Sequence, residues 1–239
     1  YWCIGEHVMT ISRNSRLALA ALMGVGLSFI YIPLSVVVIN SFNASKTFSW
    51  PPTHFTTMWW SKALENTGVR EAIKWSVLAG LSATAIALVL GTVLAFAVSR
   101  YQFFGREVIS LLVVLPISLP GIVTGIALNN AFTKQLGMST GLLTVIIGHA
   151  TFCIVVVYNN AIARLRRMGT SLQEASMDLG ANGITTFRLV TLPNLASALF
   201  AGGLLAFGLS FDEIVVTTFT AGPGIQTLPI WIFNNLFRP

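Results

Sequence analysis

The stretch Ser171–Pro193 reads SLQEASMDLGANGITTFRLVTLP, and it is a polar segment between two long apolar runs in the second half of the chain. Glu174 follows Ser171 by three residues, which is the capping-box spacing, so a short helix is predicted to begin at Ser171. Gly180 is placed to end this helix. We therefore expect a short, mostly polar helix that connects two apolar segments.

One face of the predicted helix is small and mostly apolar. Its members recur at helical spacing: Leu172, Ala175, Ser176 and Leu179. The polar side chains of Gln173, Glu174 and Asp178 are expected elsewhere on the surface. Two interpretations fit this pattern: a helix that docks on a partner protein, or an amphipathic connector that lies on the membrane surface.

Composition places the whole chain in a membrane. Hydrophobic residues make up 54% of the 239 residues and charged residues only 9%, whereas soluble domains carry about 25% charged residues. The apolar residues come in runs long enough to cross a bilayer as helices. The fold class predicted is therefore all-α, a polytopic membrane helix bundle. The net charge of +6 comes mostly from loops, so it argues for membrane orientation and against nucleic-acid binding.

Five spans are predicted from these runs. Their approximate ranges are 17–38, 73–98, 108–132, 141–163 and 195–216. The segment 40–71 contains Trp50, Trp59 and Trp60 and is expected to be an outer loop with a short interfacial helix. The second span is rich in Ala, Gly, Ser and Thr, which favours packing against other helices over exposure to lipid.

The third span contains helix breakers. Pro116, Pro120 and Gly121 remove backbone hydrogen bonds that lipid cannot replace. One interpretation is a helix that lines a transport pathway, with the amides of Asn129 and Asn130 further along it. The other is a kinked helix that serves packing alone, and Gly121 with Gly125 forms a weak packing signal.

His149 and Cys153 lie one helical turn apart in the fourth span, a spacing that invites a metal site. Two ligands do not make a zinc site, and no further cysteine or carboxylate lies in this segment. A polar partner on a neighbouring helix explains a buried histidine better. Cys3 and Cys153 do not suggest a disulfide framework.

Basic residues favour one side of the membrane. Arg13, Arg16, Arg100, Arg106, Arg164, Arg166, Arg167 and Arg188 fall on the side that includes the segment 171–193. The other side has Lys46, Lys62, Arg70, Lys134 and Arg238, with Lys74 near its edge. The positive-inside rule then predicts a cytoplasmic N-terminus and a cytoplasmic 171–193 segment.

This segment resembles the EAA loop of binding-protein-dependent ABC importer permeases, written E-A-A-x3-G-x9-I-x-L-P. Five positions match, namely Glu174, Ala175, Gly180, Leu192 and Pro193. Ser176 stands in place of the second Ala and Val190 in place of Ile, and both changes are mild. In that family the loop is a coupling helix seated in a groove of a separate ATPase. The resemblance therefore implies that Ser171, Leu172, Glu174, Ala175, Ser176, Leu179 and Gly180 couple this chain to an ATPase.

A second patch is similar to the spermidine/putrescine permeases. It comprises LSFDEIVV at 209–216, GPG at 222–224 and TLPI at 227–230. The resemblance implies an importer of polyamines, although related permeases carry ferric ion, thiamine and other solutes. It also implies a second permease, two ATPase copies and an extracytoplasmic polyamine-binding protein in a bacterial inner membrane. A sixth span is expected beyond residue 239.

The chain carries no Walker A motif, because none of its lysines follows the required Gly-x4-Gly spacing. We therefore expect a non-catalytic subunit without a cofactor of its own, with ATP and Mg²⁺ bound by the partner ATPase. Residues 1–16 are expected to form a cytoplasmic segment and residues 17–239 a transmembrane permease domain. Because Met9 resembles a natural start, residues 1–8 are expected to be upstream or non-native sequence.

Asp212 and Glu213 are carboxylates at the edge of a predicted span. At about 1.5 Å per residue, Asp212 lies ~26 Å along a helix that begins at Leu195, near the far side of a ~30 Å hydrocarbon layer. Acids there are costly unless they are paired or hydrated. A passing polyamine cation, a fixed basic partner, or simple hydration would each offset this cost. By resemblance, Asp212 is the preferred pathway residue.

Two further classes stay open at this point. A secondary transporter could also use broken helices and membrane acids, but it has no need of a capped, small-faced cytoplasmic helix. A membrane assembly factor without transport activity could have docking loops and no pathway. Transport without an ATPase would favour the first class, and absence of substrate-stimulated ATP hydrolysis in the complex would favour the second.

Overall fold

The computed structural model describes residues 12–47 and 50–236. The suggested upstream residues 1–8 and Cys3 lie outside this range. The described chain is almost entirely helical, and its one β contact is an isolated antiparallel bridge between Asn43 and Phe55. The predicted all-α class is confirmed. The chain divides into two compact units, one ending at Glu65 and the other starting at Asn66.

The first unit contains α1 (Arg13–Asn40) and the short α2 (Met58–Glu65). No described side chain of α1 is buried within the chain, as expected for an apolar helix that faces lipid or another subunit. The predicted interfacial helix is α2. The loop before it is held by the Trp59 Nε1–H, which donates to the Asn43 carbonyl at 3.1 Å.

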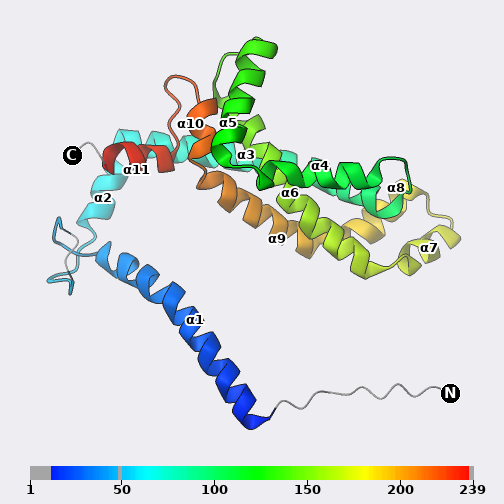
Figure 1. The fold of residues 1–239 in the computed structure, drawn as a ribbon, viewed down its shortest axis with the longest axis horizontal. Helices are drawn as coiled ribbons and strands as arrows, with labels where there is room; N and C mark the ends of the chain where they lie inside the picture. Colours follow the sequence, from blue (N-terminus) through cyan, green and yellow to red (C-terminus); the bar gives the residue numbers. More distant parts are fainter. Residues whose placement is uncertain (1–11, 48–49, 237–239) are drawn as a thin grey trace. The chain divides into compact units, whose positions relative to one another are not determined.

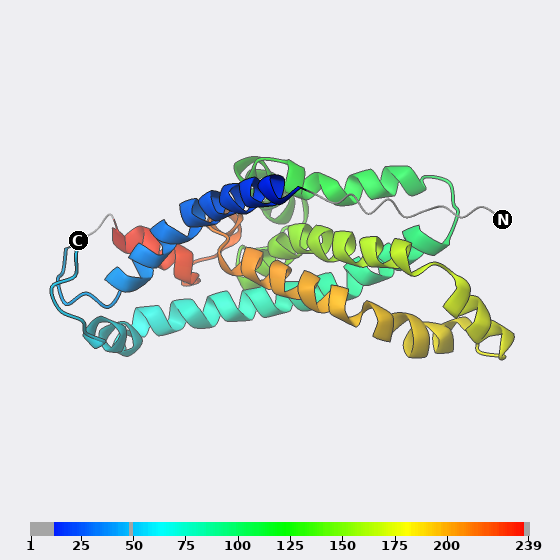
Figure 2. The same cartoon turned by 90° about the horizontal axis from the view of Figure 1, so that it is seen from below.

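The second unit is built on three long helices that run side by side (Figures 1 and 2): α3 (Thr67–Arg100), α6 (Leu142–Met168) and α9 (Leu192–Phe211). Small residues make this close packing possible. A Cβ on Gly91 of α3 would lie 3.0 Å from Val157 Cβ and 3.1 Å from the Ile154 carbonyl oxygen of α6. The prediction that the second span packs on protein is confirmed.

α6 and α9 contact each other through three successive residue pairs. His149 contacts Ser210, Cys153 contacts the Ala206 carbonyl, and Val157 lies against Gly202. From one pair to the next, the residue number rises by four on α6 and falls by four on α9, which is the pattern of two antiparallel helices. This register fixes which residues meet at the ends of the two helices.

The predicted third span is two helices and not one. α4 (Arg106–Ser118) and α5 (Gly121–Asn130), which continues into the π-turn η1 (Ala131–Gln135), are bent by 106° at the break. Pro120 stands at the N-cap of α5, where its missing N–H costs nothing, while Pro116 lies inside α4. Among the described residues, four continuous helices are long and apolar enough to span a membrane, and the bent pair makes five if it crosses once.

The predicted fifth span was placed wrongly at both ends. The helical run begins at Gly183, passing through α8 (Gly183–Thr186) and the π-turn η2 (Phe187–Thr191) into α9, and it stops at Phe211 instead of Val216. Pro193 does not start the helix. The π-turn η2 lies just before Pro193. Its wider backbone accommodates the proline ring and the missing N–H, whereas a continuous α-helix would clash with the ring and lose a hydrogen bond.

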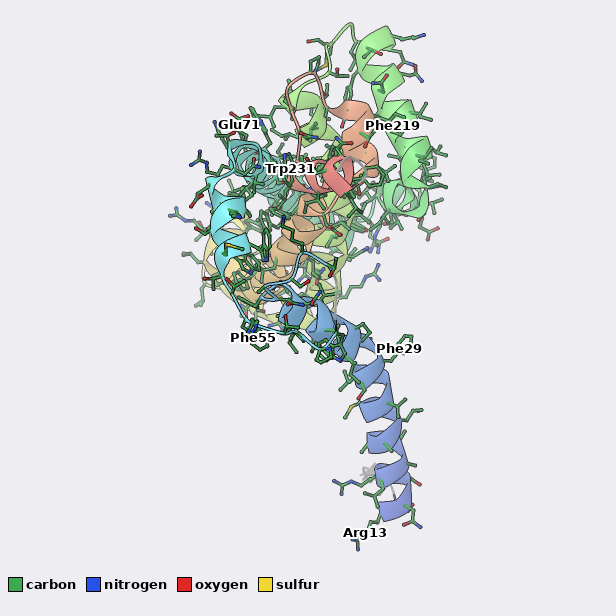
Figure 3. The ribbon with its side chains drawn as sticks, turned by 90° about the vertical axis from the view of Figure 1, so that its left-hand side faces the viewer. Arg13, Phe29, Phe55, Glu71, Phe219 and Trp231 are labelled. Atoms are coloured by element: carbon green, nitrogen blue, oxygen red, sulfur yellow. The ribbon has the colours of Figure 1, made fainter. Side chains whose placement is uncertain are left out.

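Two short helices complete the second unit. α10 (Val215–Thr220) lies against α5, where a Cβ on Gly125 would meet the Phe219 ring at 2.6 Å (Figure 3). α11 (Leu228–Leu236) packs on the start of α3, because the Leu228 N–H donates to Ser76 Oγ at 2.8 Å and Trp231 lies beside Gly68. Gly121 and Gly125 of α5 both lie against α10, next to Val215 and Phe219, so this pair serves packing, as its spacing suggested. A sixth span beyond residue 239 stays a prediction.

Candidate functional site

The segment after α6 folds as the short helix α7 (Ser171–Asp178). It lies at one end of the α3–α6–α9 bundle (Figure 2). The predicted start at Ser171 is confirmed, but the capping box is not formed. Thr170 occupies the N-cap position, and no side chain caps the helix there. Ser171 is already the first helical residue, so it is one position too late for its hydroxyl to accept from the N3 amide.

The end of α7 is defined by Gly180, as predicted. Its φ of +87° is the left-handed conformation that favours glycine. The Gly180 N–H donates to the Met177 carbonyl at 2.8 Å, and the Ala181 N–H donates to the Ser176 carbonyl at 3.2 Å. These two bonds form a Schellman motif, which reverses the chain immediately after the helix.

The apolar face of α7 is not covered by any described residue of this chain. Leu172 is 54% exposed and Leu179 is 90% exposed, with Ala175 between them also exposed. Ser176 is half-buried because its hydroxyl bonds Thr186 Oγ1 at 3.0 Å. Exposed leucines on a polar, eight-residue helix are typical of a surface that contacts a partner protein or the membrane.

Gln173 was expected on the surface, and this expectation was wrong. Its side chain is buried, and Nε2 donates to Thr191 Oγ1 of η2 at 2.9 Å. The bond fixes which face of α7 turns outward. Glu174 and Asp178 are exposed, as expected. Nothing in the local spacing distinguished Gln173 from these two polar neighbours.

The loop before α7 is also held to the end of α3. The Arg100 guanidinium Nη2 donates to the Gly169 carbonyl at 2.9 Å. Arg100, Arg106 and the arginines that end α6 therefore belong to the same end of the second unit as α7. Within the second unit, the basic loops that were assigned to one side of the membrane lie at one end.

The acidic pair lies at the opposite end of α9, in the link between α9 and α10. Asp212 is the C-cap residue of α9, and its side chain is exposed. Within the described residues no hydrogen bond or ion pair of its carboxylate is present. Glu213 differs, since its Oε1 accepts the Val216 N–H of α10 at 2.8 Å. The positive end of α10 thus offsets the charge of Glu213.

A pocket of about 470 Å³ opens beside this link. Its polar lining residues are Thr218, Gln226 and Asn234, and Ile214 of the link also lines it. Asp212 is not among the lining residues. All of these come from the link, α10, the loop after it and α11.

The broken span contributes to packing at the same end. Asn129 Nδ2 donates to the Phe219 carbonyl of α10 at 2.6 Å, so this amide has a fixed partner. Pro116 is half-buried and Pro120 exposed. Asn129 is thus brought near the Asp212 link through α10, whereas the two prolines shape the bend between α4 and α5.

His149 has the polar helix partners that its sequence context favoured. Its Nδ1 lies 2.7 Å from Ser210 Oγ and its Nε2 2.8 Å from Thr217 Oγ1. Cys153 Sγ contacts the Ala206 carbonyl at 3.4 Å. In the described ranges no cluster of three His, Cys, Asp or Glu side chains could hold a metal. Ser210 and Thr217 were missed because a single hydroxyl in an apolar run carries no signal in the sequence.

Comparisons with known proteins agree with this architecture. Residues 87–239 match the family described as the binding-protein-dependent transport system inner membrane component. The chain is 34% identical over 219 residues to the putrescine transport system permease protein PotI of Escherichia coli (strain K12), covering 89% of this chain and 77% of that protein. It is 32% identical over 220 residues to the spermidine/putrescine permease PotC of the same organism, with 92% and 82% covered.

More distant similarities mark the breadth of the family. The sulfate transport system permease protein CysW of Synechococcus elongatus is 28% identical, with 87% of this chain and 76% of that protein covered. A crystal structure of a bacterial ABC transporter involved in import of the acidic polysaccharide alginate shares the fold. Its TM-score is 0.66 at 17% identity, covering 93% of this chain and 80% of that one.

These matches decide against a secondary transporter and against an assembly factor without transport activity. Relatives in this family are membrane permease subunits of ABC transporters, and the apolar helices fit a multi-pass inner-membrane protein. The chain therefore belongs to the family of binding-protein-dependent transport system inner membrane components, and it is a permease component of an ABC importer.

Proposed function

We propose that this permease imports a polyamine, spermidine or putrescine, by alternating access. It would act with a second permease, an ATPase dimer that binds ATP and Mg²⁺, and an extracytoplasmic polyamine-binding protein. The observation that carries the proposal is the exposed carboxylate of Asp212, which has no partner within the described chain, in a protein 34% identical to a putrescine permease. A dication passing this point would offset the cost of an acid at the membrane edge.

The geometry of the two ends supports this arrangement. α7 presents exposed leucines at the end where the arginine-rich loops gather, which the positive-inside rule assigns to the cytoplasm. Residues Ser171 to Gly180 would dock there on the ATPase, and the N-terminus would be cytoplasmic. Asp212 would then lie at the extracytoplasmic mouth, because α9 carries the chain from one end of the unit to the other.

The two acids have different roles in this proposal. Asp212 faces the passing cation, while Glu213 caps α10 through the Val216 N–H. The amides of Gln226 and Asn234 in the neighbouring pocket supply carbonyl oxygens that an ammonium group could use. Asn129 would support α10 beside the pathway through its bond to the Phe219 carbonyl, and the break at Pro116 and Pro120 would bend the chain without contacting solute.

The test is uptake of putrescine and spermidine by Asp212→Asn and Glu213→Gln in the assembled transporter. Asp212→Asn is expected to lower uptake at limiting substrate by roughly tenfold, as loss of about 1.4 kcal/mol of interaction does. Glu213→Gln keeps an oxygen acceptor for Val216 and should retain most of the activity. Membrane abundance and ATPase binding are measured in parallel.

Full uptake by Asp212→Asn in an intact complex would remove Asp212 from the pathway. The solute is tested separately, by competing labelled putrescine with sulfate, ferric ion and thiamine. An anion such as sulfate is not expected to compete, because the exposed Asp212 repels it. Saturable uptake of one of these solutes without polyamine uptake would overturn the polyamine assignment.

A further inference from the structure

His149 joins three helices, and it has no role in the function proposed above. It stands on α6 with its side chain fully buried, and its two ring nitrogens reach Ser210 of α9 and Thr217 of α10. Ser210 lies two residues before Asp212, and Thr217 lies four residues after Glu213. The imidazole therefore bridges the two ends of the link that carries the acids.

The direction of each hydrogen bond follows from counting protons. Thr217 Oγ1 donates its only proton to the Glu213 carbonyl at 2.9 Å. Its oxygen can then only accept, so His149 Nε2 carries the proton and donates. Since the ring is buried and no carboxylate contacts it among the described residues, it is neutral, and Nδ1 accepts from the Ser210 hydroxyl.

These bonds form a chain that ends on the link itself. Ser210 donates to His149, His149 donates to Thr217, and Thr217 donates to the backbone of Glu213. At the C-terminal end of α10, Asn129 and Thr144 hold the Phe219 and Thr220 carbonyls at 2.6 and 2.7 Å. The other contacts of the link stay within its own segment: the Asp212 N–H bonds the Gly208 carbonyl at 3.2 Å, Glu213 Oε1 accepts the Val216 N–H at 2.8 Å, and the Ile214 carbonyl accepts the Thr218 N–H at 2.9 Å. The His149 chain thus fixes both entry to and exit from the link.

We propose that His149 is a positioning residue for transport, whose neutral Nε2–H tautomer clamps α9 to α10 and thereby sets where the Asp212 carboxylate points. It does not touch solute. The proposal rests on the proposed role of Asp212 for its effect on uptake, but the clamp itself can be measured without transport.

Two substitutions separate the two hydrogen bonds of the clamp, here called its arms, one to Ser210 and one to Thr217. His149→Gln can place an amide N–H where Nε2 stands and so restore the donor to Thr217. His149→Phe keeps a ring of similar size and removes both arms. Cys153→Ser is the matched control for uptake, since it lies one turn along the same α6–α9 contact and reaches only the Ala206 carbonyl.

The first readout is the rate at which a charged thiol reagent modifies Asp212→Cys in the reconstituted complex, with Cys153 and Cys3 replaced by alanine. His149→Phe is expected to change this rate at least threefold and His149→Gln to bring it back towards the parent. The second readout is uptake with Asp212 intact. His149→Phe should raise the half-saturating polyamine concentration several-fold with a smaller change in maximal rate, and Cys153→Ser should change neither.

If His149→Phe does not assemble, Thr217→Val and Thr217→Ser test the same chain from α10. Valine removes the acceptor and should reproduce the altered reactivity at position 212, while serine keeps it and should not. Unchanged reactivity at position 212 in His149→Phe and Thr217→Val would overturn the clamp, whatever Asp212→Asn does to uptake. Altered reactivity alongside normal uptake by Asp212→Asn would keep the clamp and reject the pathway role of Asp212.

Discussion

α7 and α10 are both short helices that follow a long membrane helix, yet they are stabilised in opposite ways. α7 exposes its leucines and buries a polar side chain, Gln173. α10 buries Val216, Thr217 and Thr220, and receives hydrogen bonds from α5 and α6. α7 is thus left open for a partner, whereas α10 is fixed within its own chain. The difference predicts that changes in α7 affect coupling and changes around α10 affect the geometry of the acidic link.

The largest effect on uptake is expected for changes in α7 and in the turn that ends it. Glu174→Arg and Gly180→Val should leave the protein in the membrane and lower uptake by more than about tenfold, since a docking surface depends on a few well-packed residues. Valine at position 180 is strained because φ is +87° there. Gly183→Val is the matched control, because an added side chain meets nothing within 4 Å at either glycine but Gly183 does not have a positive φ. Normal ATPase pull-down and uptake by both variants would show that α7 does not dock.

A smaller effect on stability is expected where α5 holds α10. Asn129→Leu removes the donor to the Phe219 carbonyl and should cost about 1–3 kcal/mol. Asn130→Leu, at an exposed neighbouring position, should cost little. Thermal unfolding of the purified transporter gives the comparison. Equal midpoints for the two variants would mean that this bond does not hold α10.

The break between α4 and α5 gives a test of water access near α10. Ser118 is exposed and Thr124 half-buried, and each hydroxyl bonds its own helix. Cysteines at these positions should react with water-soluble thiol reagents at least several-fold faster than one at the buried Thr144, in one or more transport states. Equal protection in nucleotide-free and nucleotide-trapped complexes would leave the break with a packing role alone.

The smallest effect is expected for the inward face of α7. Gln173→Leu removes the hydrogen bond to Thr191 and should make the packing of α7 on η2 less stable by about 1 kcal/mol. Uptake should fall by less than about fivefold, since the outward leucines remain. Asp178→Asn, which is exposed, should be neutral. A loss as large as that of Gly180→Val would show that the buried face also takes part in coupling.

Much of this architecture was predictable because membrane helices and helix ends leave local signals. Apolar runs marked the long helices, and Gly180 marked the end of α7 through a backbone conformation that glycine favours. The small residues of α3 indicated a packed helix, which Gly91 against α6 confirms. The coupling and pathway roles of these residues stay predictions.

Other features depended on contacts between distant segments. The stop of α9 at Phe211 was not predicted, although Asp212 and Glu213 interrupt the apolar run, because two acids alone do not show that Glu213 accepts a backbone N–H from a new helix. The π-turn before Pro193 and the 106° bend after Ser118 also depend on the surrounding backbone.

The sequence alone determined the class of this protein, its membrane helices, the polar segment between α6 and α9 and its resemblance to importer permeases, since hydropathy, glycine and motif spacing are local properties. Only the tertiary structure decided that Gln173 turns inward, that Glu213 has a partner while Asp212 has none within the described chain, and that His149 bridges Ser210 and Thr217. These are hydrogen bonds between residues up to 68 positions apart. Their partners are single hydroxyl, amide and backbone groups, which look alike in a sequence until folding brings them together.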